Sequence, residues 1–151
     1  MDEIIEELKK YKHVYTNTVK FSDVDSFNVV HNIQYLYWVG WAREEYMRDL
    51  FQANDKQFSF SDFTVMIVHT DIDYFEPLHH GETYKILTRI SQVKDSSLTF
   101  KNIIISGTKL ISSVSSVLVN LDLKSKQKER IPDYIRKLIS DYEIDADKIY
   151  V

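Results

Sequence analysis

Hydrophobic residues recur with a helical period in the middle of the chain, between Phe21 and Phe51. At about 100° per residue they fall on two opposite sides of one predicted helix, and few charged residues interrupt them. One side has Ile33, Leu36, Tyr37, Gly40, Met47 and Phe51, and the other has Tyr35, Trp38, Ala42 and Tyr46. Because a helix that is apolar on nearly all sides must be buried, the pattern predicts a central helix enclosed by the fold.

A short acidic segment, residues 22–28 with the sequence SDVDSFN, precedes this helix. Short Asp, Ser and Asn side chains bond to neighbouring backbone groups and therefore favour turns. The N-terminus of a helix has a partial positive charge, which attracts carboxylates. We expect Asp23 and Asp25 to lie in a turn directly before the helix.

Five other stretches alternate between apolar and polar residues with the period of two that indicates β-strands. They are residues 11–21, 63–74, 83–94, 98–106 and 109–123. The last four follow one another through turns too short for parallel crossovers, so these strands are expected to be antiparallel. The pattern predicts an α+β fold in which one antiparallel sheet wraps around the long helix.

The remaining segments are shorter. A helix is predicted over residues 2–10, and a closing helix begins near Pro132 and buries Tyr134, Ile135, Leu138 and Ile139. Residues 52–61 are polar and lack periodicity, which predicts a loop. The open edges of a single sheet are usually covered or paired, so a homodimer is expected.

Composition narrows the class of protein. A chain of 151 residues fits a single domain, 1–151. The net charge of −4, with no basic stripe, argues against a nucleic-acid partner. No apolar run is long enough to span a membrane, and the acidic N-terminus lacks the features of a secretory signal, so we expect a cytoplasmic protein.

The sequence lacks the residues that several kinds of active site require. The sequence has no cysteine, which excludes a thiolate nucleophile, and no G-x-S-x-G or glycine-rich phosphate loop. His69, His79 and His80 have no metal-ligand spacing, and two of them lie in a predicted turn. We therefore expect no metal site and no bound cofactor.

One set of residues resembles a known family. The segment FSDVDSF is followed by Val30, Asn32, Tyr35, Leu36, Trp38, Ala42 and Arg43, and later by Asp73-Tyr74, Pro77-Leu78 and Gly81-Glu82. This arrangement is similar to the 4-hydroxybenzoyl-CoA thioesterase family of hotdog-fold proteins. The resemblance implies a five-stranded antiparallel sheet around one long helix, flanked here by short N- and C-terminal helices. It also implies homodimers or tetramers of dimers, with a site at the dimer interface that hydrolyses acyl-CoA. Coenzyme A is then part of the substrate. The resemblance does not specify which acyl group the substrate has.

Thioester hydrolysis needs a base or nucleophile and donors that hold the oxyanion. From the residues alone, capping of the helix is the favoured role for both Asp23 and Asp25. The resemblance points to Asp25 as the general base or nucleophile, and to Asn32 at the carbonyl end of the substrate. Free backbone N–H groups between Val30 and Asn32, including that of His31, are expected to bind the oxyanion. Asp23 is expected to be structural.

Three positions depart from the family pattern. Asn28 and Val29 stand where the family usually has Gly and often His, and Gly40 stands where it usually has Glu. Glu44, one helical turn beyond Gly40, either serves as an accessory acid in place of that Glu or simply pairs with Arg43 or Arg48.

Alternative functions remain at this stage. The resemblance favours an acyl-CoA thioesterase, and it leaves an acyl-carrier-protein thioesterase and a catalytically silent acyl-binding or scaffold dimer as alternatives. A hotdog dehydratase fits less well, because Val29 removes the histidine that such enzymes use.

Overall fold

The computed structural model describes residues 2–56, 63–143 and 148–149. Five strands form one sheet in the order β1-β3-β4-β5-β2, and all neighbouring pairs are antiparallel. Their bounds are β1 His13–Thr18, β2 Val65–Tyr74, β3 Thr83–Val93, β4 Ser97–Ser106 and β5 Lys109–Asn120. The predicted antiparallel sheet is confirmed.

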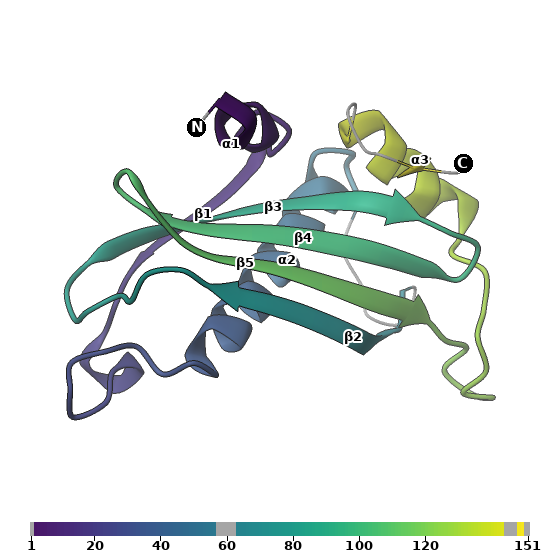
Figure 1. Ribbon diagram of the computed structural model, residues 1–151. Helices are drawn as coiled ribbons and strands as arrows, with labels where there is room; N and C mark the ends of the chain where they lie inside the picture. The colour runs from purple at the N-terminus through teal and green to yellow at the C-terminus, as the bar shows by residue number, and fades with distance from the viewer. Residues whose placement is uncertain (1, 57–62, 144–147, 150–151) are drawn as a thin grey trace.

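One long helix, α2 (Gln34–Gln52), lies across one face of this sheet (Figure 1). Two shorter helices, α1 (Asp2–Leu8) and α3 (Asp133–Tyr142), lie on the side of β1 and β3, while β2 forms the opposite edge. The architecture is therefore the expected α+β arrangement of a five-stranded antiparallel sheet around a long helix, with a short helix near each end.

The core lies between α2 and the sheet. Trp38 of α2 is fully buried and stacks on Tyr84 of β3, with ring centroids 4.1 Å apart. Further along α2, Tyr46 packs edge-on against Phe100 of β4 at 5.5 Å. The buried α2 residues are Tyr35, Trp38, Val39, Ala42, Tyr46, Met47, Leu50 and Phe51.

The prediction that α2 is buried on nearly all sides is wrong. Ile33 directly before the helix, and Tyr37 and Trp41 within it, are 58%, 60% and 45% exposed. These residues follow one another at a spacing of four, so they line one side of the helix. The sheet covers α2 from one side only, which leaves this apolar stripe uncovered.

The acidic segment does not run directly into α2. Phe21–Asp23 forms a short 3-10 helix, Val24 pairs with Val30 in an isolated antiparallel bridge, and α2 begins only at Gln34. The segment therefore closes on itself as a compact loop, and neither Asp23 nor Asp25 caps α2.

Strand β2 is an edge strand, because β5 is its only partner among the described strands. The register with β5 shifts between Ile67 and His69, which marks a bulge. Met66, Ile67 and Val68 are each about half exposed along this edge. Apolar side chains on a long unpaired edge favour pairing with another chain.

The chain ends differ in part from expectation. The first helix ends at Leu8, two residues earlier than predicted, and none of its residues is buried. In α3, Ile135, Leu138 and Ile139 are buried as predicted, whereas Tyr134 is 38% exposed. A two-residue strand β6 (Lys148–Ile149), which the pattern did not predict, pairs in parallel with the end of β3.

Two further observations concern the rest of the chain. Half of the loop predicted over residues 52–61, namely residues 57–61, lies outside the described residues. Among the helices of the described part, none is long and apolar enough to cross a membrane.

Candidate active site

Asp25 is held by the backbone of its own loop. Its Oδ1 atom accepts hydrogen bonds from the N–H groups of Phe27 (2.8 Å) and Val29 (3.2 Å). The backbone of Asp25 also donates to the carbonyl oxygen of Val29 at 2.9 Å. The side chain is only partly buried, and within the described part of the chain Oδ2 has no partner. One carboxylate oxygen thus anchors the side chain while the other is available.

Asp23 differs from Asp25 in its surroundings. It is 6% exposed, and its Oδ2 accepts a hydrogen bond from the N–H of Lys20 at 2.8 Å. Its carbonyl oxygen accepts a further bond from the N–H of His31. These contacts join the two ends of the loop, so Asp23 has the structural role that was expected of it.

The backbone donors near α2 are fewer than predicted. The N–H of Val30 donates to the carbonyl oxygen of Leu78 at 2.9 Å, and the N–H of His31 donates to that of Asp23 at 3.1 Å. The expectation of free amides is therefore wrong for Val30 and His31, because the loop uses them to fix its own shape. In the described residues, the N–H groups of Asn32 and Ile33 have no acceptor.

Asn28 explains one departure from the family pattern. Its φ of 60° lies in the left-handed region, which glycine adopts freely and which asparagine tolerates better than most residues. The Asn28 side chain also accepts a hydrogen bond from the N–H of His80 at 3.1 Å. Asn28 therefore preserves the turn and fastens it to the turn between β2 and β3.

A cavity of about 240 Å³ opens beside Asn32. Its lining combines residues of the loop, the first turn of α2 and the end of β2: Val29, Val30, Asn32, Tyr35, Tyr74, Phe75, Glu76 and Pro77. Val29 connects the cavity to Asp25 through the hydrogen bond described above. Of the predicted site residues, Asn32 therefore lines this aromatic cavity itself, whereas Asp25 is joined to it only through the lining residue Val29.

Two tyrosines shape the wall of this cavity. Their rings meet edge-on, with the centroids of Tyr35 and Tyr74 5.5 Å apart. The hydroxyl of Tyr74 donates to the carbonyl oxygen of Asn32 at 2.8 Å. Burial raises the pKa of both tyrosines, so their hydroxyl groups stay protonated at neutral pH.

The contact between Tyr74 and Asn32 was not predicted from the sequence. Tyr74 was noted only as part of the Asp73-Tyr74 pattern, and 42 positions separate it from Asn32. No local spacing indicates such a contact. It arises because the end of β2 lies against the turn before α2, and only the register of the sheet determines that.

Glu44 lies apart from these residues along α2. Its Oε1 pairs with Nη2 of Arg48 at 2.7 Å, and both side chains are about half exposed. Arg43 points toward the sheet instead, with Nη1 3.4 Å from the hydroxyl of Ser116. A Cβ atom on Gly40 would lie 3.8 Å from the Arg43 guanidinium. The exposed pair with Arg48 is the alternative that the structure favours for Glu44.

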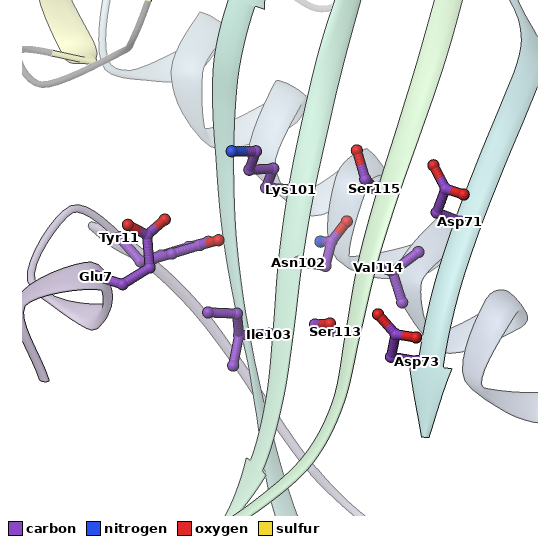
Figure 2. Close-up of a pocket in the computed structure, with 10 residues that line it drawn as sticks. All are labelled: Glu7, Tyr11, Asp71, Asp73, Lys101, Asn102, Ile103, Ser113, Val114 and Ser115. Carbon is purple, nitrogen blue, oxygen red and sulfur yellow. The ribbon is translucent and has the colours of Figure 1, made fainter. Parts of the chain in front are cut away.

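A second cavity, of about 250 Å³, lies on the other face of the sheet (Figure 2). Ile72 and Val114 pack in the core with α2, so their strand neighbours Asp71, Asp73 and Ser113 point to the opposite face. None of the predicted site residues lines this cavity. Its lining has three carboxylates, those of Glu7, Asp71 and Asp73, and one cationic side chain, that of Lys101, which makes it a poor place for the phosphates of a CoA ester.

His69 and His79 are at least partly exposed, as expected of residues without a metal-binding role. His69 pairs with Asp71, and His79 pairs with Glu82. Across the described ranges, no cluster of three or more His, Cys, Asp or Glu side chains is arranged to hold a metal ion.

Known proteins resemble this chain in sequence. Residues 19–139 match the model of the thioesterase-like superfamily. A 1,4-dihydroxy-2-naphthoyl-CoA hydrolase from Gloeothece citriformis is 29% identical over 123 residues, which cover 80% of this chain and 86% of that protein. A hydrolase of the same name from Prochlorococcus marinus is 29% identical over 91 residues, but these cover 56% of this chain and only 59% of the relative.

The fold is also found in solved structures. A 1,4-dihydroxy-2-naphthoyl-CoA thioesterase from Synechocystis superposes with a TM-score of 0.74 at 24% identity, over 85% of this chain and 96% of that one. At this identity the likeness shows the fold, which is the hotdog arrangement that the resemblance implied. The family match spans the acidic loop, α2 and the strands β2 to β5, and so the chain belongs to the thioesterase-like superfamily.

Proposed function

We propose that this protein is an acyl-CoA thioesterase in which Asp25 acts as general base or nucleophile. Membership of the thioesterase-like superfamily supports the reaction class. The observation that carries the assignment of the site is the half-anchored carboxylate of Asp25 next to the cavity that Asn32 lines. An anchored carboxylate with one open oxygen suits a base, because its position is set before the substrate arrives.

In the proposed reaction, Asp25 takes a proton from water as the water oxygen attacks the thioester carbonyl carbon. The carbonyl oxygen becomes an oxyanion, and the unpaired amides of Asn32 and Ile33 at the positive end of α2 stabilise it. The C–S bond then breaks, and CoA leaves as a thiolate. Since an ordinary thiol has a pKa of about 8.5, this leaving group needs no strong acid. In the nucleophilic variant, Asp25 attacks directly and water hydrolyses the resulting anhydride.

His31 and Glu44 take smaller parts in this proposal. The His31 side chain is exposed next to Asn32, so we assign it to the rim of the substrate site. Glu44 remains the candidate for an accessory acid only if substrate or a second subunit draws it away from Arg48.

We further infer that the acyl group is aromatic. Tyr35, Tyr74 and Phe75 line the cavity, and aromatic rings pack well against one another in offset or edge-on geometry. The relatives from Gloeothece and Prochlorococcus are named for a hydroxylated naphthoyl thioester. A hydroxylated benzoyl or naphthoyl thioester of CoA is therefore the proposed substrate class.

The proposed assembly is a homodimer, or a tetramer built from two such dimers, with the site at the dimer interface. The unpaired edge of β2, with half-exposed Met66, Ile67 and Val68, supports pairing of two sheets into one. Because β2 ends at Tyr74 beside the cavity, the second subunit would lie close to the site.

A panel of CoA thioesters tests this function. Purified protein is assayed for released thiol with aromatic, short aliphatic and long aliphatic acyl-CoAs, and with acyl-carrier-protein thioesters as a separate arm. We expect kcat/KM to be highest for the aromatic CoA thioesters. Preference for the carrier-protein thioesters would instead make the chain an acyl-carrier-protein thioesterase. Binding of acyl-CoA without turnover would make it a silent acyl-binding protein.

A further inference from the structure

The turn before α2 is tied to the sheet by one long-range hydrogen bond. The hydroxyl of Tyr74, the last residue of β2, donates to the carbonyl oxygen of Asn32 at 2.8 Å. Both residues line the cavity beside the proposed base. The ring of Tyr74 is itself supported by an edge-on contact with Tyr35 of α2.

This bond determines how one peptide group is oriented. A trans peptide is planar, so its C=O and N–H point in opposite directions. When Tyr74 holds the C=O of Asn32, the N–H of Ile33 in the same peptide must point away from Tyr74. The preceding peptide is fixed in the same way, because the carbonyl oxygen of His31 accepts a bond from the N–H of Gln34 at 2.9 Å.

Two consecutive amides are thereby kept open. The carbonyl groups of both peptides are occupied, while the N–H groups of Asn32 and Ile33 have no acceptor in the residues that the structure describes. The neighbouring amides of Val30 and His31 are already used inside the loop. Tyr35, which also lines the cavity, likewise has an N–H without an acceptor in the described residues. The turn therefore offers three such amides, and Tyr74 and Gln34 orient the peptides that carry two of them.

We propose that Tyr74 is a positioning residue that holds the Asn32–Ile33 peptide in the orientation needed to bind the oxyanion. The inference rests on the proposed thioesterase function. Tyr74 does not take part in bond making; it acts through the peptide that it fixes. Without the hydroxyl, the Asn32 carbonyl loses its partner and the turn becomes free to rotate about this peptide.

The test compares variants at position 74 in the protein of 151 residues. Tyr74→Phe removes the hydroxyl and keeps the ring. We expect kcat for an aromatic acyl-CoA to fall by about 10-fold to 100-fold, since a small misplacement of transition-state groups has effects of this order. KM should change by less than about threefold, because an interaction made only in the transition state lowers kcat and kcat/KM equally.

Two further variants separate the hydroxyl from the ring. At position 74, 4-aminophenylalanine retains a donor, and 4-methylphenylalanine has a similar volume without one. We expect the amino variant to recover most of the wild-type kcat and the methyl variant to stay as slow as Tyr74→Phe. The amino and methyl variants also test the role of the hydroxyl if Tyr74→Phe does not fold. Tyr37→Phe, at an exposed tyrosine of α2, is the matched control and should leave kcat unchanged.

Three results would overturn the inference: a Tyr74→Phe enzyme with kcat within twofold of wild type, a rise in KM with unchanged kcat, or equal rates for the amino and methyl variants. The last would mean that ring packing alone matters. If the wild-type protein hydrolyses no acyl thioester, the proposed function fails first, and the inference fails with it. An active wild type with an unaffected Tyr74→Phe refutes the inference alone.

Discussion

Asp23 and Asp25 are two positions apart in the sequence, yet their environments are opposite. Asp23 is buried and bonded to the backbone of Lys20, whereas Asp25 is partly exposed and keeps one oxygen open. The residues alone allowed both to be helix caps, and the structure shows that neither caps α2. What separates them is the closed loop between Val24 and Val30, which no local spacing specifies.

At the same scale, Glu44 permits a sharp prediction. Because its carboxylate pairs with Arg48 on the exposed side of α2, Glu44→Gln should leave kcat within about twofold of wild type. The loss of an exposed i,i+4 pair should lower the free energy of unfolding by no more than about 0.5 kcal/mol. Steady-state kinetics and urea unfolding measure the two effects. A drop in kcat of tenfold or more would show that Glu44 is an accessory acid after all.

At the scale of elements, hydrophobic periodicity predicted which segments become helices and strands but not which side of α2 is covered. Both sides of α2 are apolar in the sequence, and burial follows from which side the sheet meets. Trp38 stacks on Tyr84, and the opposite stripe with Tyr37 and Trp41 remains exposed. The bulge in β2 and the strand β6 also depend on contacts between distant segments, so periodicity did not reveal them.

Glu143 links three elements at the far end of α2 from the candidate site. Its Oε1 accepts hydrogen bonds from the hydroxyl of Tyr46 in α2 at 2.6 Å and from the N–H of Ile90 in β3 at 3.0 Å. Glu143 itself follows directly after α3 and is 4% exposed. Burial raises the pKa of this carboxyl, although these two hydrogen bonds and the nearby charges of Arg89 and Lys12 oppose the rise.

The raised pKa of Glu143 predicts how stability depends on pH. The folded state binds a proton on the Glu143 carboxyl more tightly than the unfolded state does. Protonated Glu143 therefore adds to the free energy of unfolding, and this contribution is fully present below the unfolded pKa of about 4.5. It is lost as the pH rises through the folded pKa. Glu143→Gln keeps an oxygen acceptor and removes the buried charge, so it should raise the thermal midpoint at pH 7 and have less effect at pH 4.

Calorimetric scans of wild type and Glu143→Gln at both pH values measure this difference. Asp141→Asn is the matched control, because it removes an exposed carboxylate of α3 that pairs with Lys137 and leaves the buried site intact. This control should change the midpoint little at either pH. A lower midpoint for Glu143→Gln at pH 7 would contradict the account, because it would mean that the charged form stabilises the fold.

At the scale of the whole molecule, the unpaired β2 edge predicts self-association. We expect sedimentation velocity at micromolar concentration to show a dimer or a tetramer. Val68→Lys places a charge on the edge where two copies would meet, and should shift the protein toward monomer. Val14→Lys is the matched control, because Val14 lies on β1 at the opposite edge of the sheet and is about as exposed as Val68. This control should not shift the protein toward monomer. Monomeric wild-type protein would refute the proposed assembly.

The sequence allowed the architecture to be predicted, and it led to the proposal of Asp25 and Asn32 as the main positions of the site. Periodicity determined the elements, short turns required antiparallel pairing, and the family resemblance selected Asp25 over Asp23. The donors of the site were predicted less well. Val30 and His31 use their amides within the loop, and Tyr74 reaches Asn32 from a distant strand. Such contacts depend on how the loop closes and how β2 is registered in the sheet.

The central claim is that Asp25 acts as the base or nucleophile in thioester hydrolysis, and one comparison tests this claim most directly. Asp25→Asn and Asp23→Asn are measured side by side for kcat on an aromatic acyl-CoA and for thermal midpoint. Asp25→Asn keeps an oxygen for the Phe27 and Val29 amides, so the protein should stay folded while kcat falls by roughly 10²–10⁴, the usual effect of losing a positioned base. Asp23→Asn should lower the thermal midpoint clearly and should change kcat only slightly. Full thioesterase activity in Asp25→Asn would contradict the account.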